Sequence, residues 1–217
     1  MKQNNSILHM AIAALAIVQS TNAAAASLLE AIVFGQAQQQ TTAGEIVACG
    51  VTVSAIEKPP GTPVGRTLVF NGSIMIYGPA GGLVKGRVAD IDAKAVASGN
   101  LDVGLLKTLP SERIWMKAPN VAATEPNVGT TITKSEDPGY SLYASGFTAT
   151  WGVIHAILEK APIQIGFKVK SKNIEQVLFG EVQMPESQRA QLEQCLGEWS
   201  TSISKKYKAE PSKEESK

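Results

Sequence analysis

The chain has 217 residues, with 20 lysine or arginine residues against 19 aspartate or glutamate residues and a formal net charge of +1. This near-neutral balance gives no global attraction to nucleic acid or to an anionic membrane, so we expect no nucleic-acid partner. The length is sufficient for a substantial hydrophobic core.

The first 25 residues match the pattern of a secretory signal peptide. Lys2 gives a positive start, residues 7–18 form an apolar run, and residues 23–25 are three alanines before a cleavage point. The apolar run of about 12 residues is shorter than the roughly 20 that cross a bilayer as a helix. We therefore expect an exported, periplasmic or secreted mature chain without a transmembrane span.

Two cysteines, Cys49 and Cys195, remain in the mature chain. An even number of cysteines in an exported protein predicts a disulfide bond. The bond would close a loop of about 147 residues, which chain-entropy arguments value at roughly 5 kcal/mol. The wide separation excludes a Cys-x-x-Cys redox motif within the chain.

Residues 26–45 are predicted to form an N-terminal extension. Within it, residues 27–34 suit a short helix or strand, and the glutamine- and threonine-rich residues 36–42 suit a linker. Residues 46–56 then alternate between apolar and polar side chains, which predicts a half-buried strand with Cys49 facing the core.

Residues 67–77 consist of two apolar, β-branched runs on either side of Asn71-Gly72. Asn-Gly tolerates the positive φ values of a type I′ turn, so we predict a β-hairpin with its turn at this dipeptide. Residues 83–93 suit a further strand, and residues 93–97 suit a single helical turn.

The next segment mixes strand and turn signals. Residues 113–117 and 128–134 suit short strands, and Asp-Pro-Gly at 137–139 predicts a turn. Residues 140–158 are apolar and aromatic, with two glycines that suggest bends between two strands. A helix at residues 153–160 is the alternative.

The final part predicts a strand pair and a helix. Residues 163–170 alternate cleanly, and residues 174–182 return as the partner strand. Pro185 suits the first position of a helix. A disordered Lys/Glu-rich tail follows at residues 204–217. The apolar residues of the helix fall on one face: Leu192, Cys195, Leu196, Trp199 and Ile203.

Together these elements predict a mainly β fold, a sandwich or partly open barrel of roughly eight antiparallel strands with a C-terminal α-helix packed on the sheet. The expected organisation is a signal peptide at 1–25, the extension at 26–45, a globular domain at 46–203 and the tail at 204–217. Both cysteines then face the core, as a disulfide requires.

The sequence contains few groups suited to catalysis. His155 is the one histidine outside the signal peptide, so zinc sites built from several imidazoles are excluded. No Gly-x-Ser-x-Gly elbow marks a nucleophile. His155 is either a general base or an ordinary histidine within an apolar run. Asp90 and Asp92 share one side of a strand but are too few for a cation site, and the glycine-rich residues 78–86 lack phosphate-loop spacing, so we expect no metal and no cofactor.

Aromatic side chains give the candidate binding residues. Tyr140, Tyr143 and Trp151, with His155 close by and Trp115 further away, are suited to lining a carbohydrate or peptide groove. Core packing is the alternative for each ring. No catalytic residue is nominated beyond the hypothesis for His155.

The leading hypothesis is an exported, non-catalytic β-rich binding or envelope-associated protein, whose partner is an envelope protein or polysaccharide. One alternative is a hydrolase or lyase that acts on envelope polymers through carboxylates or His155. A second alternative is a structural subunit of an envelope assembly, joined to its partners through exposed strand edges.

Overall fold

The computed structural model describes residues 26–58, 65–78, 81–99, 102–126, 133–170 and 174–209. The predicted signal peptide, most of the predicted strand at 128–134 and the last eight residues of the predicted tail lie outside these ranges. Within the described ranges, no helix combines the length and the apolar character needed to cross a membrane.

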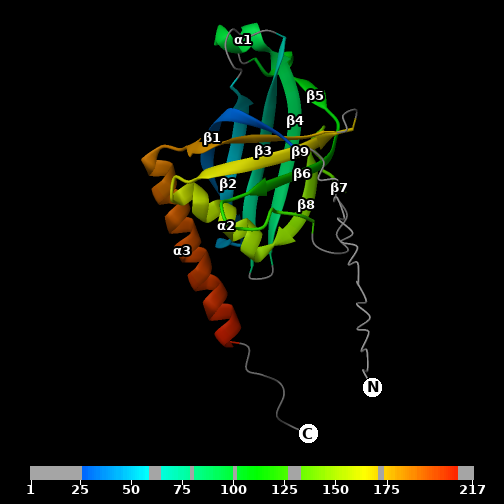
Figure 1. The fold of residues 1–217 in the computed structure, drawn as a ribbon. Helices are drawn as coiled ribbons and strands as arrows, with labels where there is room; N and C mark the ends of the chain where they lie inside the picture. Colours follow the sequence, from blue (N-terminus) through cyan, green and yellow to red (C-terminus); the bar gives the residue numbers. More distant parts are fainter. Residues whose placement is uncertain are drawn as a thin grey trace, which may run out of the picture.

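Strands make up most of the described residues (Figure 1). They are β1 Ser27–Thr42, β2 Glu45–Glu57, β3 Arg66–Tyr77, β4 Gly81–Asp92, β5 Lys107–Leu109, β6 Ser111–Lys117, β7 Thr133–Lys134, β8 Ser141–Gly146, β9 Pro162–Val169 and β10 Glu175–Gln183. The helices are α1 Ala93–Ala97, α2 Phe147–Leu158 and α3 Glu186–Ala209, and a 3₁₀ turn spans Val103–Leu105. The predicted mainly β fold with a C-terminal helix is confirmed.

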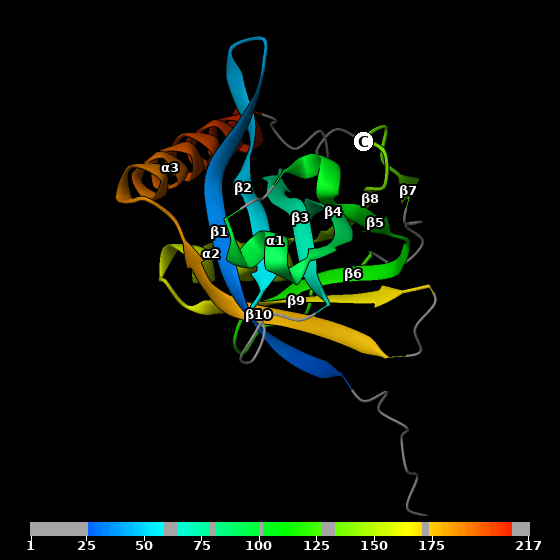
Figure 2. The same cartoon turned by 90° about the horizontal axis from the view of Figure 1, so that it is seen from above.

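The strands form one open sheet in the order β6-β9-β10-β1-β2-β3-β4-β8-β7, with β5 paired to β4. All described pairs are antiparallel except β1 with β10, which is parallel. Strands β6, β9 and β10 run across β2, β3 and β4 at a steep angle (Figures 1 and 2). The sheet therefore curls, and its two parts face each other across the core.

Strand β1 joins the two parts of the sheet. Its residues 27–34 pair with β10, and its residues 31–42 pair with β2. Ala31 and Val33 point into the core and are buried. The predicted linker at 36–42 is therefore wrong, because polar glutamine side chains on an exposed ribbon leave the backbone free to pair. This half of the β1–β2 ribbon projects from the rest of the sheet (Figure 2).

Strand β3 runs without a break through Asn71-Gly72, so the predicted hairpin turn is wrong. Asn71 lies between Ser54 of β2 and Arg87 of β4, and its side chain accepts a 2.9 Å hydrogen bond from the Ser54 hydroxyl. A Cβ atom on Gly72 would lie 2.5 Å from the Phe70 ring. The glycine therefore serves close packing in the middle of the sheet rather than a turn.

The segment 140–158 folds as strand β8 followed by helix α2, so the prediction of two strands is wrong and the helical alternative is closer. Val153, Ile154 and Ile157 share one buried face at helical spacing. A Cβ atom on Gly152 would lie 2.7 Å from Val121, so this glycine lets α2 approach the chain that follows β6. Gly152, where the sequence predicts a bend between strands, therefore lies inside a helix and allows a close contact with Val121.

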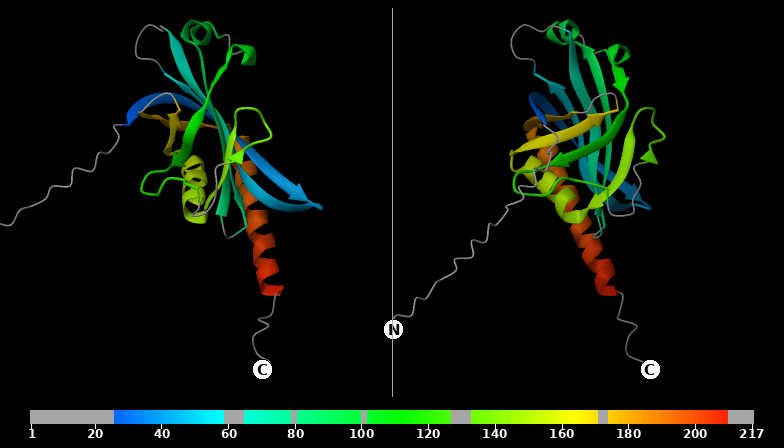
Figure 3. Two further views of the ribbon diagram at one scale, coloured as in Figure 1. Left: turned by 90° about the vertical axis from the view of Figure 1, so that its right-hand side faces the viewer. Right: turned by 45° about the vertical axis from the view of Figure 1, so that its right-hand side comes forward.

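Helix α3 begins after Pro185, as predicted, and packs on β2 and β1. Four residues of its predicted apolar face, Leu192, Cys195, Leu196 and Trp199, are buried, and Ile203 is half-buried. The helix continues to Ala209, so the predicted disordered tail is wrong for residues 204–209, where Lys206 forms a 2.8 Å ion pair with Glu45. Figure 3 shows the helix extending past the sheet.

The predicted disulfide bond between Cys49 and Cys195 is confirmed. Its Cα atoms lie 5.9 Å apart, within the usual range for a disulfide. Both residues are buried, Cys49 on the core face of β2 and Cys195 on the core face of α3. The bond therefore fastens the last helix to an early strand.

A buried arginine ties α3 to the end of α2. The Arg189 guanidinium donates to the main-chain oxygen of Val182 at 2.9 Å and to the main-chain oxygen of Ile157. Arg189 is 4% exposed. Backbone carbonyls at the end of a helix are suited to a cation, so this contact satisfies the last turn of α2.

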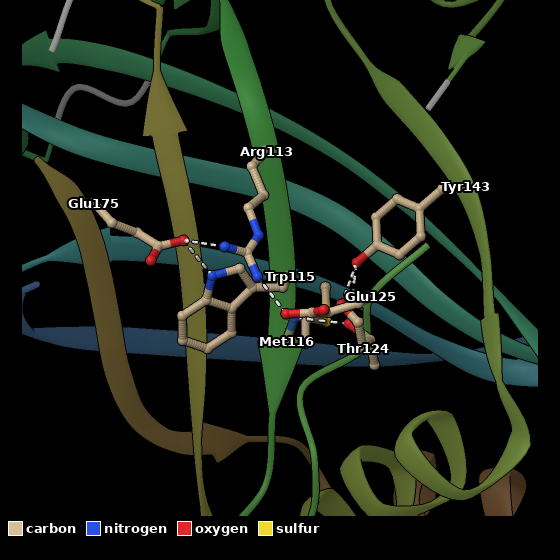
Figure 4. A network of polar contacts seen from close by, with 7 residues as sticks. All are labelled: Arg113, Trp115, Met116, Thr124, Glu125, Tyr143 and Glu175. Atoms are coloured by element: carbon tan, nitrogen blue, oxygen red, sulfur yellow. Dashed lines mark hydrogen bonds and ion pairs between the residues drawn. The ribbon is translucent and has the colours of Figure 1, made fainter. Parts of the chain in front are cut away.

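The two parts of the sheet are joined through Thr124, which lies between β6 and β8 (Figure 4). The Thr124 main-chain N–H donates to the Met116 carbonyl at 2.7 Å, and the Thr124 hydroxyl accepts from the Met116 N–H at 2.8 Å. On the other side, the Tyr143 hydroxyl donates to the Thr124 carbonyl at 2.9 Å. Pro126 continues the contact through a bridge to Ser145. We call this group, Met116, Thr124, Pro126, Tyr143 and Ser145, the seam.

Removing the disulfide is expected to lower the free energy of unfolding by up to roughly 5 kcal/mol, since the unfolded chain regains the entropy of a long loop. The measurement is urea unfolding of the oxidised protein, the reduced protein and the double variant Cys49→Ala/Cys195→Ala. The oxidised protein should also migrate faster than the reduced protein on electrophoresis. Two titratable thiols per purified chain would contradict the bond.

Replacing Thr124 by valine keeps the side-chain shape but leaves the buried Met116 N–H without its partner. The expected loss is about 1–3 kcal/mol in the free energy of unfolding. Thr52→Val on β2 is the matched control: its hydroxyl donates only an exposed 3.2 Å hydrogen bond to Gln38, and its removal should change the value by less than about 0.5 kcal/mol. Equal effects of the two substitutions would show that the seam does not stabilise the fold.

Candidate functional site

The four candidate binding residues lie in three places. Trp151 and His155 line one hollow on the surface, and Tyr140 lines another. Tyr143 is buried in the seam and lines neither. Trp115 is also buried, with its ring over Gly166 and its Nε1 donating to Glu175 at 2.6 Å.

The first hollow lies between α2 and the chain that follows β6, and has a volume of about 370 Å³. We call it the Trp151 hollow. Most of its lining is apolar, and its polar groups are a hydroxyl, an imidazole and a carboxylate. The lining residues are Ala118, Pro119, Val121, Thr148, Trp151, Gly152, His155, Ala156, Glu159 and Ala161.

Helix α2 carries three rings in a row, of which Trp151 and His155 line this hollow and Phe147 packs beside Trp151. Phe147, Trp151 and His155 are spaced four residues apart, which puts them on one side of a helix. The Phe147 and Trp151 rings are nearly parallel, at 7° with centroids 6.4 Å apart. The centroids of Trp151 and His155 are 6.0 Å apart. The Trp151 ring is therefore held in one orientation by its neighbours while it remains half-buried.

His155 stands at the edge of the hollow rather than inside it. Its side chain is 54% exposed, and its nearest charged partner is Glu159, 3.9 Å away on the next turn of the same helix. The described lining offers Thr148 as its hydroxyl and includes no serine or cysteine. Thr148, His155 and Glu159 are therefore the side chains of this lining that can form hydrogen bonds with a bound molecule.

The second hollow lies at the opposite end of β6 and has a volume of about 780 Å³. We call it the Tyr140 hollow. Its lining differs in chemistry, because hydroxyl and lysine side chains take the place of the apolar ones. The lining residues are Thr108, Pro110, Ser111, Glu112, Thr133, Lys134, Ser135, Pro138, Gly139, Tyr140, Ser141 and Lys170.

A tight turn holds Tyr140 at this hollow. The predicted turn at 137–139 is confirmed by a 3.3 Å hydrogen bond from the Tyr140 N–H to the Asp137 carbonyl. Gly139 has φ +80°, and a Cβ atom there would lie 2.8 Å from Thr108. Only glycine meets both conditions, so the turn is seated closely against β5.

Two cations of β4 stand against the Tyr140 ring. The Lys85 ammonium is 5.0 Å from the ring centroid, and the centre of the Arg87 guanidinium is 4.9 Å from it. Lys85 also pairs with Asp137 of the same turn. Neither cation lines the hollow, so both contact the ring from outside it.

The acidic residues singled out from the sequence have structural roles. Asp92 accepts a 2.8 Å hydrogen bond from the Lys94 N–H and thereby caps α1, and Asp90 pairs with Arg66. Across the described ranges, no group of three or more histidine, cysteine or acidic side chains is arranged to hold a metal ion.

Sequence reasoning missed the lysines and hydroxyls of the Tyr140 hollow. They come from three segments, near residues 108–112, 133–141 and 170, that only the folded sheet brings together. Phe147 and Glu159 were missed for another reason. Their helical spacing from Trp151 and His155 is visible in the sequence, but the two glycines of this segment predict strands with bends rather than a helix.

Tyr143 makes the seam sensitive to high pH. Burial raises the pKa of its phenol, and the hydrogen bond from Thr124 opposes part of that rise. A raised pKa in the folded state means that the stabilisation is present below the ordinary tyrosine pKa of about 10 and is lost as the pH rises above it. The free energy of unfolding should therefore fall above about pH 10 more steeply in the wild type than in Tyr143→Phe.

The measurement is urea unfolding at pH 8, 10 and 11 for both proteins, with Tyr140→Phe as the control at a partly exposed tyrosine. Burial raises the pKa of Tyr77 as well, but this residue is present in all three proteins and its effect cancels in the comparison. Identical pH slopes for wild type and Tyr143→Phe would contradict the role given to Tyr143.

Comparisons with known proteins supply no relative for this geometry. No family model matches the chain, and neither a curated protein nor a solved structure matches it. The functional conclusion therefore rests on the two hollows and on the side chains that line them.

Proposed function

We propose that the chain is exported to an oxidising compartment and acts there as a non-catalytic binding protein for an envelope polysaccharide, with the Trp151 hollow as its ligand site. The observation that carries the proposal is the half-buried Trp151 ring, held between Phe147 and His155 beside a preformed hollow. The disulfide bond is compatible with an oxidising location.

The chemistry of the Trp151 hollow suits one sugar ring. A sugar presents an apolar C–H face that packs on an aromatic ring, and its hydroxyls need hydrogen-bond partners at the edge. Thr148, His155 and Glu159 supply such partners around Trp151. The volume of about 370 Å³ is near the lower end of the range of roughly 300–1,000 Å³ for small-molecule sites, which fits a ring-sized group.

A structural role within an envelope assembly is a second candidate. The outward face of β1 carries Leu28, Ile32 and Phe34, which are 56%, 40% and 46% exposed. Such a row of apolar side chains on one strand favours contact with another protein. Sedimentation that finds a monomer at all accessible concentrations would leave the binding function as the better proposal.

The binding experiment uses a neutral hexamer of β-1,4-linked N-acetylglucosamine as the probe. We expect saturable binding to the mature protein by calorimetry, together with a change in tryptophan fluorescence. Trp151→Ala should weaken binding about tenfold, since an aromatic contact contributes ~0.5–1.5 kcal/mol beyond buried area. Glu159→Gln should weaken it less, because the amide still forms a hydrogen bond.

Tyr140→Ala is the control and should leave binding of the neutral hexamer unchanged. Equal affinity of wild type and Trp151→Ala would overturn the assignment of the site. Cleavage of the hexamer that disappears in a folded His155→Ala variant would replace the proposal by the hydrolase hypothesis. Circular dichroism of each variant verifies that the fold is intact.

A further inference from the structure

We propose that the Tyr140 hollow is a second binding site, specific for acidic saccharides that carry carboxylate groups. The site is separate from the Trp151 hollow and does not depend on the function proposed for it. The two lie at opposite ends of β6, with Ser111 and Glu112 at one and Ala118 and Pro119 at the other.

The lining of the Tyr140 hollow is rich in hydroxyl groups. Five serine or threonine side chains and the Tyr140 phenol surround it, contributed by β5, β6, β7, the turn and β8. Two of the five have internal partners, since Thr133 donates to the Leu142 carbonyl and Ser135 accepts from the Asp137 N–H. A surface of this kind offers both donors and acceptors to a ligand that is itself rich in hydroxyls.

Two lysines give the hollow a positive charge. Lys134 and Lys170 line it, and neither forms an ion pair within the described ranges. The one carboxylate in the described lining, Glu112, faces Lys168 at 3.5 Å. An acidic group that enters the hollow therefore meets unpaired ammonium groups without a competing free carboxylate.

Arg87 adds a third positive group beside the hollow. Its guanidinium lies against the Tyr140 ring, and its Nε is buried without a hydrogen-bond partner. Lys85, the other cation at the ring, is already paired with Asp137. Among the described residues at this end of the sheet, three cations without an ion pair, Arg87, Lys134 and Lys170, therefore stand against one such carboxylate, Glu136 beside the turn, and the excess positive charge attracts anions.

The site is held in place before a ligand arrives. The Ser135 N–H donates to the Tyr140 carbonyl at 3.0 Å, and the turn between them packs against Thr108 through Gly139. Binding then requires little ordering of the chain, which favours affinity. The volume of about 780 Å³, roughly twice that of the Trp151 hollow, accommodates more than one sugar unit.

The experiment titrates the mature protein with hexagalacturonate and, separately, with its fully methyl-esterified form, which has the same length and hydroxyls but no charge. We expect saturable binding of the acid, at least tenfold weaker binding of the ester, and loss of affinity for the acid as salt rises. Equal binding of both ligands, or no binding of the acid at low salt, would overturn the proposal.

The variants separate a specific site from general attraction between charges. Lys134→Gln/Lys170→Gln should weaken binding of the acid at least tenfold. Lys94→Gln/Lys117→Gln removes the same charge from lysines that do not line the hollow and should change affinity less than twofold. If both double variants weaken binding equally, the attraction is non-specific and the proposal fails.

A second readout locates the ligand. Amide chemical-shift changes on adding hexagalacturonate should cluster at residues 108–112, 133–141 and 170. Trp151→Ala should leave binding of the acid unchanged, whereas it weakens binding of the neutral hexamer. Shifts that cluster on α2 instead would place the acid in the Trp151 hollow and contradict the second site, without affecting the function proposed for the first.

Discussion

The hydrogen bonds of Thr124 are the contacts on which the shape of this protein depends. An open sheet of ten strands has two free ends, and nothing in strand pairing alone keeps them close. Thr124 binds Met116 of β6 through main chain and side chain, and it binds Tyr143 of β8 on its other side. The seam lies across the open side of the sheet, beside the core residues of β3, β4, β6 and α2, and the buried polar groups of Thr124 and Tyr143 have partners within it.

The disulfide bond and Arg189 act at the other side of the molecule. Both fasten α3, the first to β2 and the second to the ends of β10 and α2. A long amphipathic helix held only by its apolar face could slide along the sheet, since hydrophobic contact is non-directional. The disulfide at Cys195 and the three hydrogen bonds of Arg189, which lie on different turns of α3, fix both the position of the helix along the sheet and its rotation about its own axis.

The parts of the fold that could be predicted from the sequence are those in which local pattern and tertiary environment agree. The alternation in 163–170 and the proline-initiated helix at Pro185 are examples, and the disulfide, predicted from two cysteines in an exported chain, agrees with the core-facing positions predicted for Cys49 and Cys195. The errors arose where one residue type serves two purposes. Asn71-Gly72 has the composition of a turn, but its glycine makes room for the Phe70 ring, and the Asn71 side chain bonds across to Ser54. Helix α2 was hidden because its β-branched residues have strand propensity, which burial against the sheet overrides.

The residues of the candidate sites also divide into those that the local sequence nominates and those that only the fold brings together. Trp151 and His155 could be nominated together because they lie close in one aromatic segment, whereas Lys134 and Lys170 line one hollow only because β7 and the end of β9 lie near β5 and β6. Strand β6 has seven residues, so its ends are roughly 20 Å apart, and one hollow lies at each end. The strand is also one side of the seam, through Met116. Strand β6 therefore joins three features of the structure: Ser111 and Glu112 of the Tyr140 hollow, Met116 of the seam, and the chain of the Trp151 hollow that begins directly after it at Ala118.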